Sequence, residues 1–437
     1  MTSKLFFILA FVLSLPFILH SQSDFKITGE FRVRSELDGR DFLNRTYPQS
    51  FTALRARLGI EKSINDHIKL FIQLQDSRVF GEEKGTLNNL KNIDLHQGYL
   101  TVSNIFDIPL YFTVGRFKLS YGIYKIFGPN DWHNVGRSHD GFILGYNTEN
   151  NKFDLFLTTH TNFLSYRAGA ANVMQNYNYS EAPADTGFNI FGFYSTNKIG
   201  KPLAFDIYSY YEWDRQRPNG KDSKLQRYTL GTALQFSVPS LPLSFRAELA
   251  YQGGKITLAN QQDISAFMIY STIQYNFENI IVSLNADINS GGDSAKTSKY
   301  KLFDNPYSTK HNHQGFMDFF TSLSDPGFST GIYGLNDYFL RLIYKPAKQF
   351  KAQLDAHYFT TFTSFVVSEG KEISKYGPEF DLVLGYTLYN ALEIEWGSAV
   401  FIADEVMKEL YKRLPKRQGI NNFDPAFWTY IQLNLRF

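Results

Sequence analysis

Apolar and polar residues alternate with a period of two along much of this chain. The alternation is clearest at residues 25–37, 54–61 and 68–75, where apolar residues take every second position. Successive side chains of a β-strand point to opposite faces, so this period predicts strands with one apolar and one charged face. A soluble sandwich of two sheets shows the same alternation, and the pattern alone leaves the kind of β protein open.

Short and long connections alternate between the predicted strands. The short links are at residues 63–66, 103–109, 148–152, 197–202, 237–242, 276–279, 345–349 and 389–391. The long, mostly polar links are at residues 38–50, 78–92, 120–139, 161–187, 214–224, 253–263, 289–336, 361–377 and 403–425. An outer-membrane barrel alternates short periplasmic turns with long external loops, whereas sandwich connections have no such parity. Nine long and eight short links predict about 18 strands, an even number that leaves both termini in the periplasm.

The predicted strands have the length that a membrane-crossing strand needs. Residues 243–251, 267–277 and 392–401 are stretches of about 9 to 11 residues, which is the span of a tilted strand across the hydrocarbon layer. We therefore expect an all-β fold: a transmembrane antiparallel β-barrel of about 18 strands, formed by residues 24–437, with long extracellular loops and short periplasmic turns. A barrel of this size leaves an aqueous channel unless loops fill it.

The last predicted strand, residues 427–437, alternates strictly and finishes on Phe437. A terminal aromatic residue on an amphipathic last strand resembles the assembly signal of outer-membrane proteins. We expect Phe437 to be recognised by the outer-membrane assembly machinery.

Composition agrees with a barrel in lipid. Aromatic residues make up 17% of the chain, with 41 Phe and 28 Tyr, an excess that suits lipid-facing strands and their interfacial girdles. A net charge of +2 gives no bias toward nucleic acid. The absence of cysteine removes disulfides, thiolate metal sites and cysteine nucleophiles. No cofactor, metal site or catalytic residue is predicted.

Residues 1–23 have the features of a secretory signal peptide. Lys4 precedes an apolar run from Leu5 to Leu19, and the small residues Ser21 and Ser23 follow near a cleavage point. An uncleaved anchor helix is the weaker alternative because the run is shorter than the roughly 20 residues needed to cross a bilayer. With the barrel pattern, this segment predicts the outer membrane of a Gram-negative bacterium, with outer-membrane lipid around the strands.

Arginine is over-used at the positions predicted to face the lumen. Guanidinium groups suit carboxylates and phosphates, so an arginine-lined lumen favours anionic solutes. The alternative is that these charges pair across strands with the interleaved acids and stiffen the wall. The predicted channel-lining and selectivity residues are Arg32, Arg34, Arg55, Arg57, Arg116, Arg246 and Arg341.

Several motifs resemble those of the alginate-export family of outer-membrane barrels. They are the segment 114–122, Asn130-Asp-Trp132, Arg137-Ser-His-Asp-Gly141, Leu74-Gln-Asp-Ser-Arg78, and Asn305-Pro-Tyr-Ser-Thr-Lys-His311 with Gly315 and Asp318. The resemblance implies an 18-stranded channel with folded-in loops, whose arginine-lined constriction passes an anionic polysaccharide outward. The family positions carried over are Asp76, Arg78, Arg116, Trp132, Arg137, Asp140, His311 and Asp318.

The motif residues also have a structural interpretation, in which they fix how the loops fold back into the barrel. The chain departs from the family pattern at Ile123, Tyr124 and Lys125, where the family usually has an acid and an arginine. The resemblance therefore does not extend to alginate itself as the substrate.

Two of the long links carry further expectations. The link 289–336 is long enough to form a lid or constriction. The link 403–425 has Val406, Met407, Leu410, Tyr411 and Leu414 at helical spacing beside basic residues. A packed loop helix is the favoured interpretation, and a basic helix that touches anionic surface lipid is the alternative.

Three functions compete on the sequence alone. A passive channel would conduct an anionic polysaccharide, with periplasmic export partners left open, or small anionic solutes as a general porin. A barrel-embedded hydrolase would need a histidine beside an acid, for which His133, His139 and Asp140 are the nearest candidates. No catalytic signature surrounds them, so a channel is favoured over an enzyme. A purely adhesive role would show no conductance.

Overall fold

The structure is a computed structural model that describes residues 25–43, 47–83, 92–161, 187–258, 260–292, 299–320, 333–367, 370–413 and 421–437. The signal peptide predicted at residues 1–23 lies outside the described residues and stays a prediction. In the described part of the chain, no helix is long and apolar enough to cross a membrane.

The described residues form one sheet of nineteen strands. The first ten strands are β1 (Phe25–Gly39), β2 (Gln49–Ser63), β3 (Ile68–Val79), β4 (Asp94–Ser103), β5 (Leu110–Phe117), β6 (His139–Asn147), β7 (Asn151–Thr161), β8 (Phe188–Ile199), β9 (Leu203–Asp214) and β10 (Leu225–Ser237). The others are β11 (Leu243–Thr257), β12 (Gln261–Asn276), β13 (Ile280–Asn289), β14 (Lys299–Tyr300), β15 (Leu335–Ala347), β16 (Phe350–Val366), β17 (Glu372–Leu388), β18 (Leu392–Phe401) and β19 (Ala426–Arg436).

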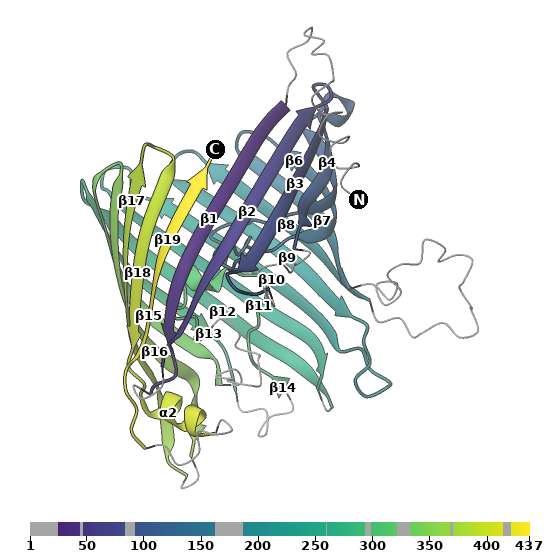
Figure 1. The fold of residues 1–437 in the computed structure, drawn as a ribbon. Coiled ribbons are helices and arrows are strands. Elements are labelled where there is room, and N and C mark those ends of the chain that lie inside the picture. The colour runs from purple at the N-terminus through teal and green to yellow at the C-terminus, as the bar shows by residue number, and fades with distance from the viewer. Residues whose placement is uncertain are drawn as a thin grey trace.

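Eighteen of these strands close into a ring (Figure 1). The exception is β14, a two-residue strand that pairs in parallel with β12. The others pair antiparallel, and β1 closes the ring by pairing with both β2 and β19, in a register from Glu30 opposite Arg436 to Gly39 opposite Phe427. Closure leaves no open edge among these strands, so the backbone N–H and C=O groups in lipid have hydrogen-bond partners on adjacent strands. The predicted 18-stranded antiparallel barrel is confirmed.

The two faces of the wall differ as the alternation predicts. On β2 and β3, Leu58 and Leu74 lie opposite each other, and each keeps 46% of its surface exposed on the outer face. The intervening residues Arg55 and Arg57 face inward and are only 1% and 6% exposed. Apolar side chains therefore meet lipid and charged side chains fill the lumen.

All eight predicted short links coincide with the ends of strands, but two predicted long links are mostly strand. Within the predicted link 253–263, only the few residues between β11 and β12 lie outside strands. Within the predicted link 361–377, only the residues between β16 and β17 do. Glycines caused the error. Gly254 has φ +119, and a Cβ there would lie 2.0 Å from the carbonyl oxygen of Gln226. This glycine allows close contact between strands inside the sheet.

The predicted loop helix is present as α2 (Glu405–Lys412), at the end of the barrel opposite the C-terminus (Figure 1). Val406, Met407, Leu410 and Tyr411 are buried, and the ring of Tyr411 packs edge-on against Phe42 at 5.4 Å. The packed loop helix is confirmed; Leu414 lies outside the described residues.

Much of the buried apolar surface lies inside the barrel. It combines inward-facing aromatic rings of the wall, such as Phe359 and Phe401, with rings from two connections, Phe127 before β6 and Phe303 and Phe320 before β15. The 3-10 helix Lys310–Asn312 belongs to the second of these connections, whereas the 3-10 helix Ile105–Asp107 lies in the short turn between β4 and β5. Long links folded into the lumen thus fill the space that a barrel of this size would leave open.

Candidate functional site: two loops folded into the lumen

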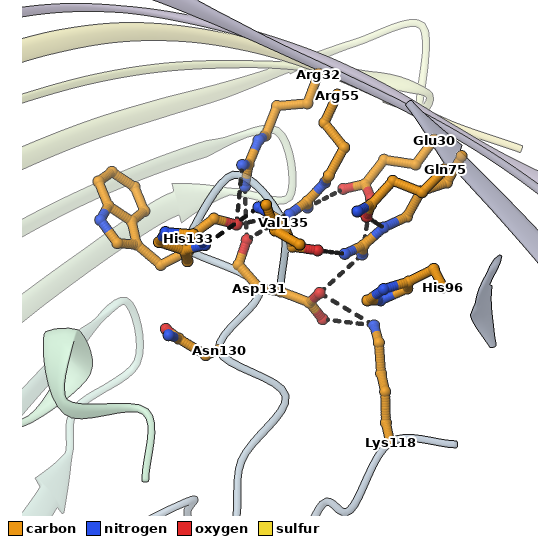
Figure 2. Close-up of polar contacts among 12 residues, drawn as sticks. Glu30, Arg32, Arg55, Gln75, His96, Lys118, Asn130, Asp131, His133 and Val135 are labelled. Carbon is orange, nitrogen blue, oxygen red and sulfur yellow. Dashed lines mark hydrogen bonds and ion pairs between the residues drawn. The ribbon is translucent and has the colours of Figure 1, made fainter. Parts of the chain in front are cut away.

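The connection between β5 and β6, residues 118–138, is bound by arginines of β1 and β2 (Figure 2). Arg32 donates to the carbonyl oxygen of Asp131 at 2.6 Å and to that of His133 at 3.3 Å. Arg55 donates to the same two oxygens, both at 2.9 Å. The period of two points both arginines inward. We call residues 118–138 the first inner loop.

Asp131 is the charged centre of this loop. Its carboxylate accepts from Arg57 at 2.8 Å and from Lys118 at 3.0 Å (Figure 2). Burial raises the pKa of the Asp131 carboxyl, but Lys118 and Arg57 outweigh it and hold this pKa well below its usual range. Glu30 accepts from Arg55 at 2.9 Å and from Arg57 at 3.3 Å. The loop is therefore held by charge-assisted bonds to both backbone and side chain.

The second inner loop, residues 301–320 between β14 and β15, binds to the first. Arg137 donates to the carbonyl oxygens of Pro306 at 2.9 Å, Ser308 at 3.1 Å and Gly128 at 2.9 Å, and also to that of Tyr307. Burial lowers the pKa of Arg137 to about 10. The backbone N–H of Gly128 donates to the Tyr307 carbonyl at 2.9 Å. One guanidinium thus joins both loops.

A stack of four side chains crosses from the wall through both loops. The guanidinium carbon of Arg34 lies 3.9 Å from the ring centroid of Trp132. Trp132 stacks on His311 at 4.0 Å, and His311 stacks on Phe316 at 4.8 Å. The His311 Nδ1 atom lies 3.0 Å from a carboxylate oxygen of Asp318. Cation–π and ring stacking contacts fix these groups against one another.

Two cavities meet at this stack, since Trp132 and His311 line both of them. The larger has a volume of about 540 Å³ and is bordered by Arg341, Lys351 and Glu395. The smaller has a volume of about 170 Å³ and is bordered by Arg137, Lys310 and Asp318, among others. The Trp132–His311 stack is therefore the partition between the two spaces.

Lys310 gives a pH-dependent prediction. Burial lowers its pKa from 10.5 to about 8, so below about pH 8 a charged ammonium destabilises the packed second inner loop. Between about pH 8 and 10.5 the packed state loses its proton before the opened state does, and packing becomes more stable as pH rises. We expect Lys310→Met to reduce channel openings at pH 7 and to flatten their pH dependence, measured by single-channel recording. Lys301→Met, at an exposed position of the same loop, is the control; an equal slope in both variants would contradict the prediction.

The structure gives the predicted lumen arginines different positions and partners. Arg32, Arg34, Arg55 and Arg57 are at most 6% exposed and bind the first inner loop. Arg341 borders the larger cavity and forms two hydrogen bonds with Asp355, at 2.7 and 2.8 Å. Arg246 lies 3.6 Å from Glu248 and 3.8 Å from Asp206. Arg116 has a different position.

Arg116 and Asp140 are on the outer face, so the prediction that they belong to the lumen and constriction is wrong. They lie opposite each other on β5 and β6 and form an ion pair at 2.7 Å. Asp140 shares its face with Phe142 and Leu144, which are 46% and 43% exposed. In β5 apolar residues occur at both parities, so its sequence did not determine which residues face inward.

Asp76 and Arg78 are also on the outer face, in the same alternation as the exposed Leu74, and they pair with each other. They do not reach the constriction. Of the motif residues carried over from the family, Trp132, Arg137, His311 and Asp318 are brought together between the two inner loops. Phe437 is 71% exposed beside Gly29, and its N–H donates to the Gly29 carbonyl at 3.1 Å. Its role as an assembly signal stays a prediction.

The predicted candidates for the hydrolase alternative, His133 and His139 with Asp140, do not form a histidine–acid pair. His139 is buried and its ring contacts the rings of His160 and Phe127 at 5.3 and 6.2 Å, whereas Asp140 points to the other face of β6. His133 contributes its carbonyl oxygen to Arg32 and Arg55.

Sequence reasoning missed several residues of the site. Lys118 and Asp131 lie within the motifs that resemble the alginate-export family, but they are not among the predicted site residues. The buried ion pair between Lys125 and Asp287 joins the first inner loop to β13. The pair spans 162 residues of sequence, and no local pattern indicates it.

The comparisons with known proteins agree with this geometry. The solved structures similar to this barrel include Pseudomonas aeruginosa OccK5 (OpdH), with 12% identity and a TM-score of 0.58 over 95% of this chain and 98% of that one. P. aeruginosa OpdL has 10% identity and a TM-score of 0.59 over 95% and 99%. OccAB4 of Acinetobacter baumannii has 11% identity and a TM-score of 0.56 over 95% and 99%. At these identities the likeness shows the fold alone. None of the curated proteins matches this chain.

The closed barrel with apolar outer face and charged lumen defines an outer-membrane channel of a Gram-negative bacterium. The model of the alginate export family matches residues 22–417. The chain belongs to that family.

Proposed function

We propose that this protein is a passive channel for anionic solutes, and that its substrate class is an anionic polysaccharide. The observation that carries the proposal is the larger cavity. Arg341, Lys351 and two histidines border it with Glu395 as the one acid among its lining residues. Such a lining favours carboxylates or phosphates over cations. The arginines of β1 and β2 act indirectly, because they position the loops that shape this cavity.

Aromatic rings favour a sugar chain over a small ion. Tyr124, Trp132, Phe316 and Tyr430 border the same cavity. Flat rings of this kind offer apolar surface beside polar tips, and a uronate polymer has apolar ring faces and carboxylates in every unit. Basic and aromatic groups together thus suit both parts of such a chain. No step of this proposal requires catalysis, and export partners in the periplasm fit it without being required.

Lys351 provides the test by single-channel recording. Lys351 has no ion pair in the described part of the chain and borders the larger cavity. We expect Lys351→Gln to lower the ratio of anion to cation permeability roughly twofold in planar bilayers. Lys198→Gln, at an exposed position near the end of β8, is the matched control. An unchanged permeability ratio in Lys351→Gln, or absence of any current, would refute the anion channel.

A general porin for small anions is the second candidate. It is favoured by the fold likeness to OpdK of P. aeruginosa, which was solved with vanillate, at 10% identity and a TM-score of 0.57. The two candidates differ in how polymer blocks the current. A polyuronate should block at far lower concentration than its monomer if the polymer is the substrate, and at an equal concentration of uronate units if the channel is a general porin.

A further inference from the structure

Four carboxylates and one histidine gather on the inner wall of the barrel, next to the larger cavity but not among its lining residues. Asp355 lies directly opposite Asp381 on β16 and β17, and His357 lies opposite Glu379. Asp337 of β15 lies beside His357. Their exposed fractions are 0% for Asp337, Asp355 and Glu379, 1% for Asp381 and 3% for His357. Like charges directly opposite each other destabilise a sheet, so this arrangement needs compensation.

The positive charge around the cluster is insufficient. Arg341 binds Asp355, and the Nδ1 atom of His357 lies 2.9 and 3.0 Å from the two carboxylate oxygens of Asp337. In the described part of the chain, neither Glu379 nor Asp381 pairs with a lysine or an arginine. A buried carboxylate without a partner costs several kcal/mol by desolvation alone. The cluster therefore needs a further positive charge, which a bound cation or a proton shared by two of the carboxylates can supply.

Three buried polar atoms of the cluster have no hydrogen-bond partner in the described structure. They are Nε2 of His357, Oδ1 of Asp381 and Oε2 of Glu379. The His357 Nε2 atom is 3.6 Å from Oδ2 of Asp381. Its ring is held between Phe339 at 4.4 Å and Phe359 at 5.3 Å. A free nitrogen is thus directed at a carboxylate without bonding to it.

The contact between Asp337 and His357 is like that between a metal-binding histidine and the carboxylate that orients its ring. Histidines that bind metals almost always donate the other ring N–H to a carboxylate or carbonyl, which fixes the tautomer and leaves the ligating nitrogen free. Donor atoms of Asp355, His357 and Asp381 all lie within 4.8 Å of one another. In a coordination shell the donors are about 2.0–2.2 Å from the ion, so binding requires the two carboxylates to turn toward the imidazole nitrogen.

We propose that Asp355, His357 and Asp381 bind one divalent cation of the first transition row, for which Zn²⁺ is the representative probe. An imidazole nitrogen with carboxylate oxygens suits this class of ion better than Ca²⁺ or Mg²⁺, which take oxygen ligands. The bound cation compensates the negative charge of the carboxylates that do not pair with Arg341. It also joins β16 to β17 from the inside.

The bound ion also fixes the second inner loop. The backbone N–H of Met317 donates to Oε1 of Glu379 at 2.8 Å, and that of Phe316 to Oδ2 of Asp381 at 3.4 Å. Of these two carboxyl groups, Asp381 is also a proposed ligand, so it faces the loop on one side and the proposed ion on the other. Binding of the ion holds Asp381 in the orientation that the Phe316 N–H requires.

The proposal is tested by metal content and spectroscopy on the full barrel purified from outer membranes. After treatment with a chelator and reloading with Zn²⁺, we expect about one tightly bound ion per chain. X-ray absorption should show a nitrogen and oxygen shell with one imidazole. Lipopolysaccharide phosphates also bind divalent ions, but they contribute no imidazole.

Variants localise the ion. We expect His357→Gln to abolish stoichiometric binding and Asp337→Asn to weaken it roughly 10- to 100-fold, measured by competition with a chromophoric chelator. His67→Gln, at the exposed turn before β3, should bind like the wild type. Equal Zn²⁺ binding in wild type and His357→Gln, or no imidazole in the wild-type spectrum, would overturn the proposal. A proton shared by Glu379 and Asp381 would then be the compensating charge.

Discussion

Replacing Arg55 and Arg57 together by alanine should raise the single-channel conductance several-fold, because the first inner loop loses its strongest anchors. The two side chains donate hydrogen bonds to the carbonyl oxygens of Asp131, His133 and Val135 and to the Asp131 carboxylate, some of them shared with Arg32 and Lys118. Breaking a buried charged pair by removal of one partner costs about 3–5 kcal/mol. A loss of that size moves a packed loop toward the open state by more than a factor of 100.

The comparison needs a control that removes equal charge elsewhere. Arg217 and Lys221 are exposed in the external link between β9 and β10, and the double alanine variant there should leave the conductance unchanged. Thermal unfolding followed by circular dichroism would establish that both variants keep the barrel. An Arg55→Ala/Arg57→Ala barrel that is folded but conducts like the wild type would show that the first inner loop does not limit the pore.

The fold followed from the sequence where alternation was strict and failed where it was not. In β1, and in β2 from Arg55 to Glu61, charged residues keep one parity, which gave the inward direction of Arg32 and Arg55 correctly. In β5, Tyr111 and Phe112 are adjacent and both aromatic, so the pattern did not assign a face to Arg116. A shift of one residue moves every side chain of a strand to the other face.

The contacts between residues of the site were harder to predict from the sequence than the fold. That Arg32 points inward is a local property of β1, whereas its bond to the Asp131 carbonyl joins residues 99 positions apart. The pairing of His357 with Asp337, and the approach of Asp381 to His357, depend on the register of three strands. Periodicity gives the face of each side chain but not its partner across the lumen.

Gly315→Ala should displace the second inner loop and change the conductance of the channel. Gly315 has φ +78, a conformation that disfavours side chains, and a Cβ there would lie 2.5 Å from Oε1 of Glu379. That oxygen accepts the N–H of Met317, so the methyl group strains the backbone and also disrupts the bond that holds the loop. We expect a conductance increase and more frequent gating in bilayer recordings, together with a lower thermal midpoint.

Gly220→Ala is a control for the backbone strain that Gly315→Ala introduces. Gly220 has φ +76, nearly the same backbone conformation, but nothing lies within 4 Å of its would-be Cβ. Backbone strain of about 1 kcal/mol is common to both variants, whereas contact with Glu379 is specific to Gly315. If Gly315→Ala changes conductance and Gly220→Ala does not, the effect depends on the second inner loop, where Glu379 accepts the Met317 N–H, and not on this backbone conformation wherever it occurs. If both leave conductance unchanged, that loop does not limit the pore, and the Trp132–His311 partition would have to be held by the first inner loop alone.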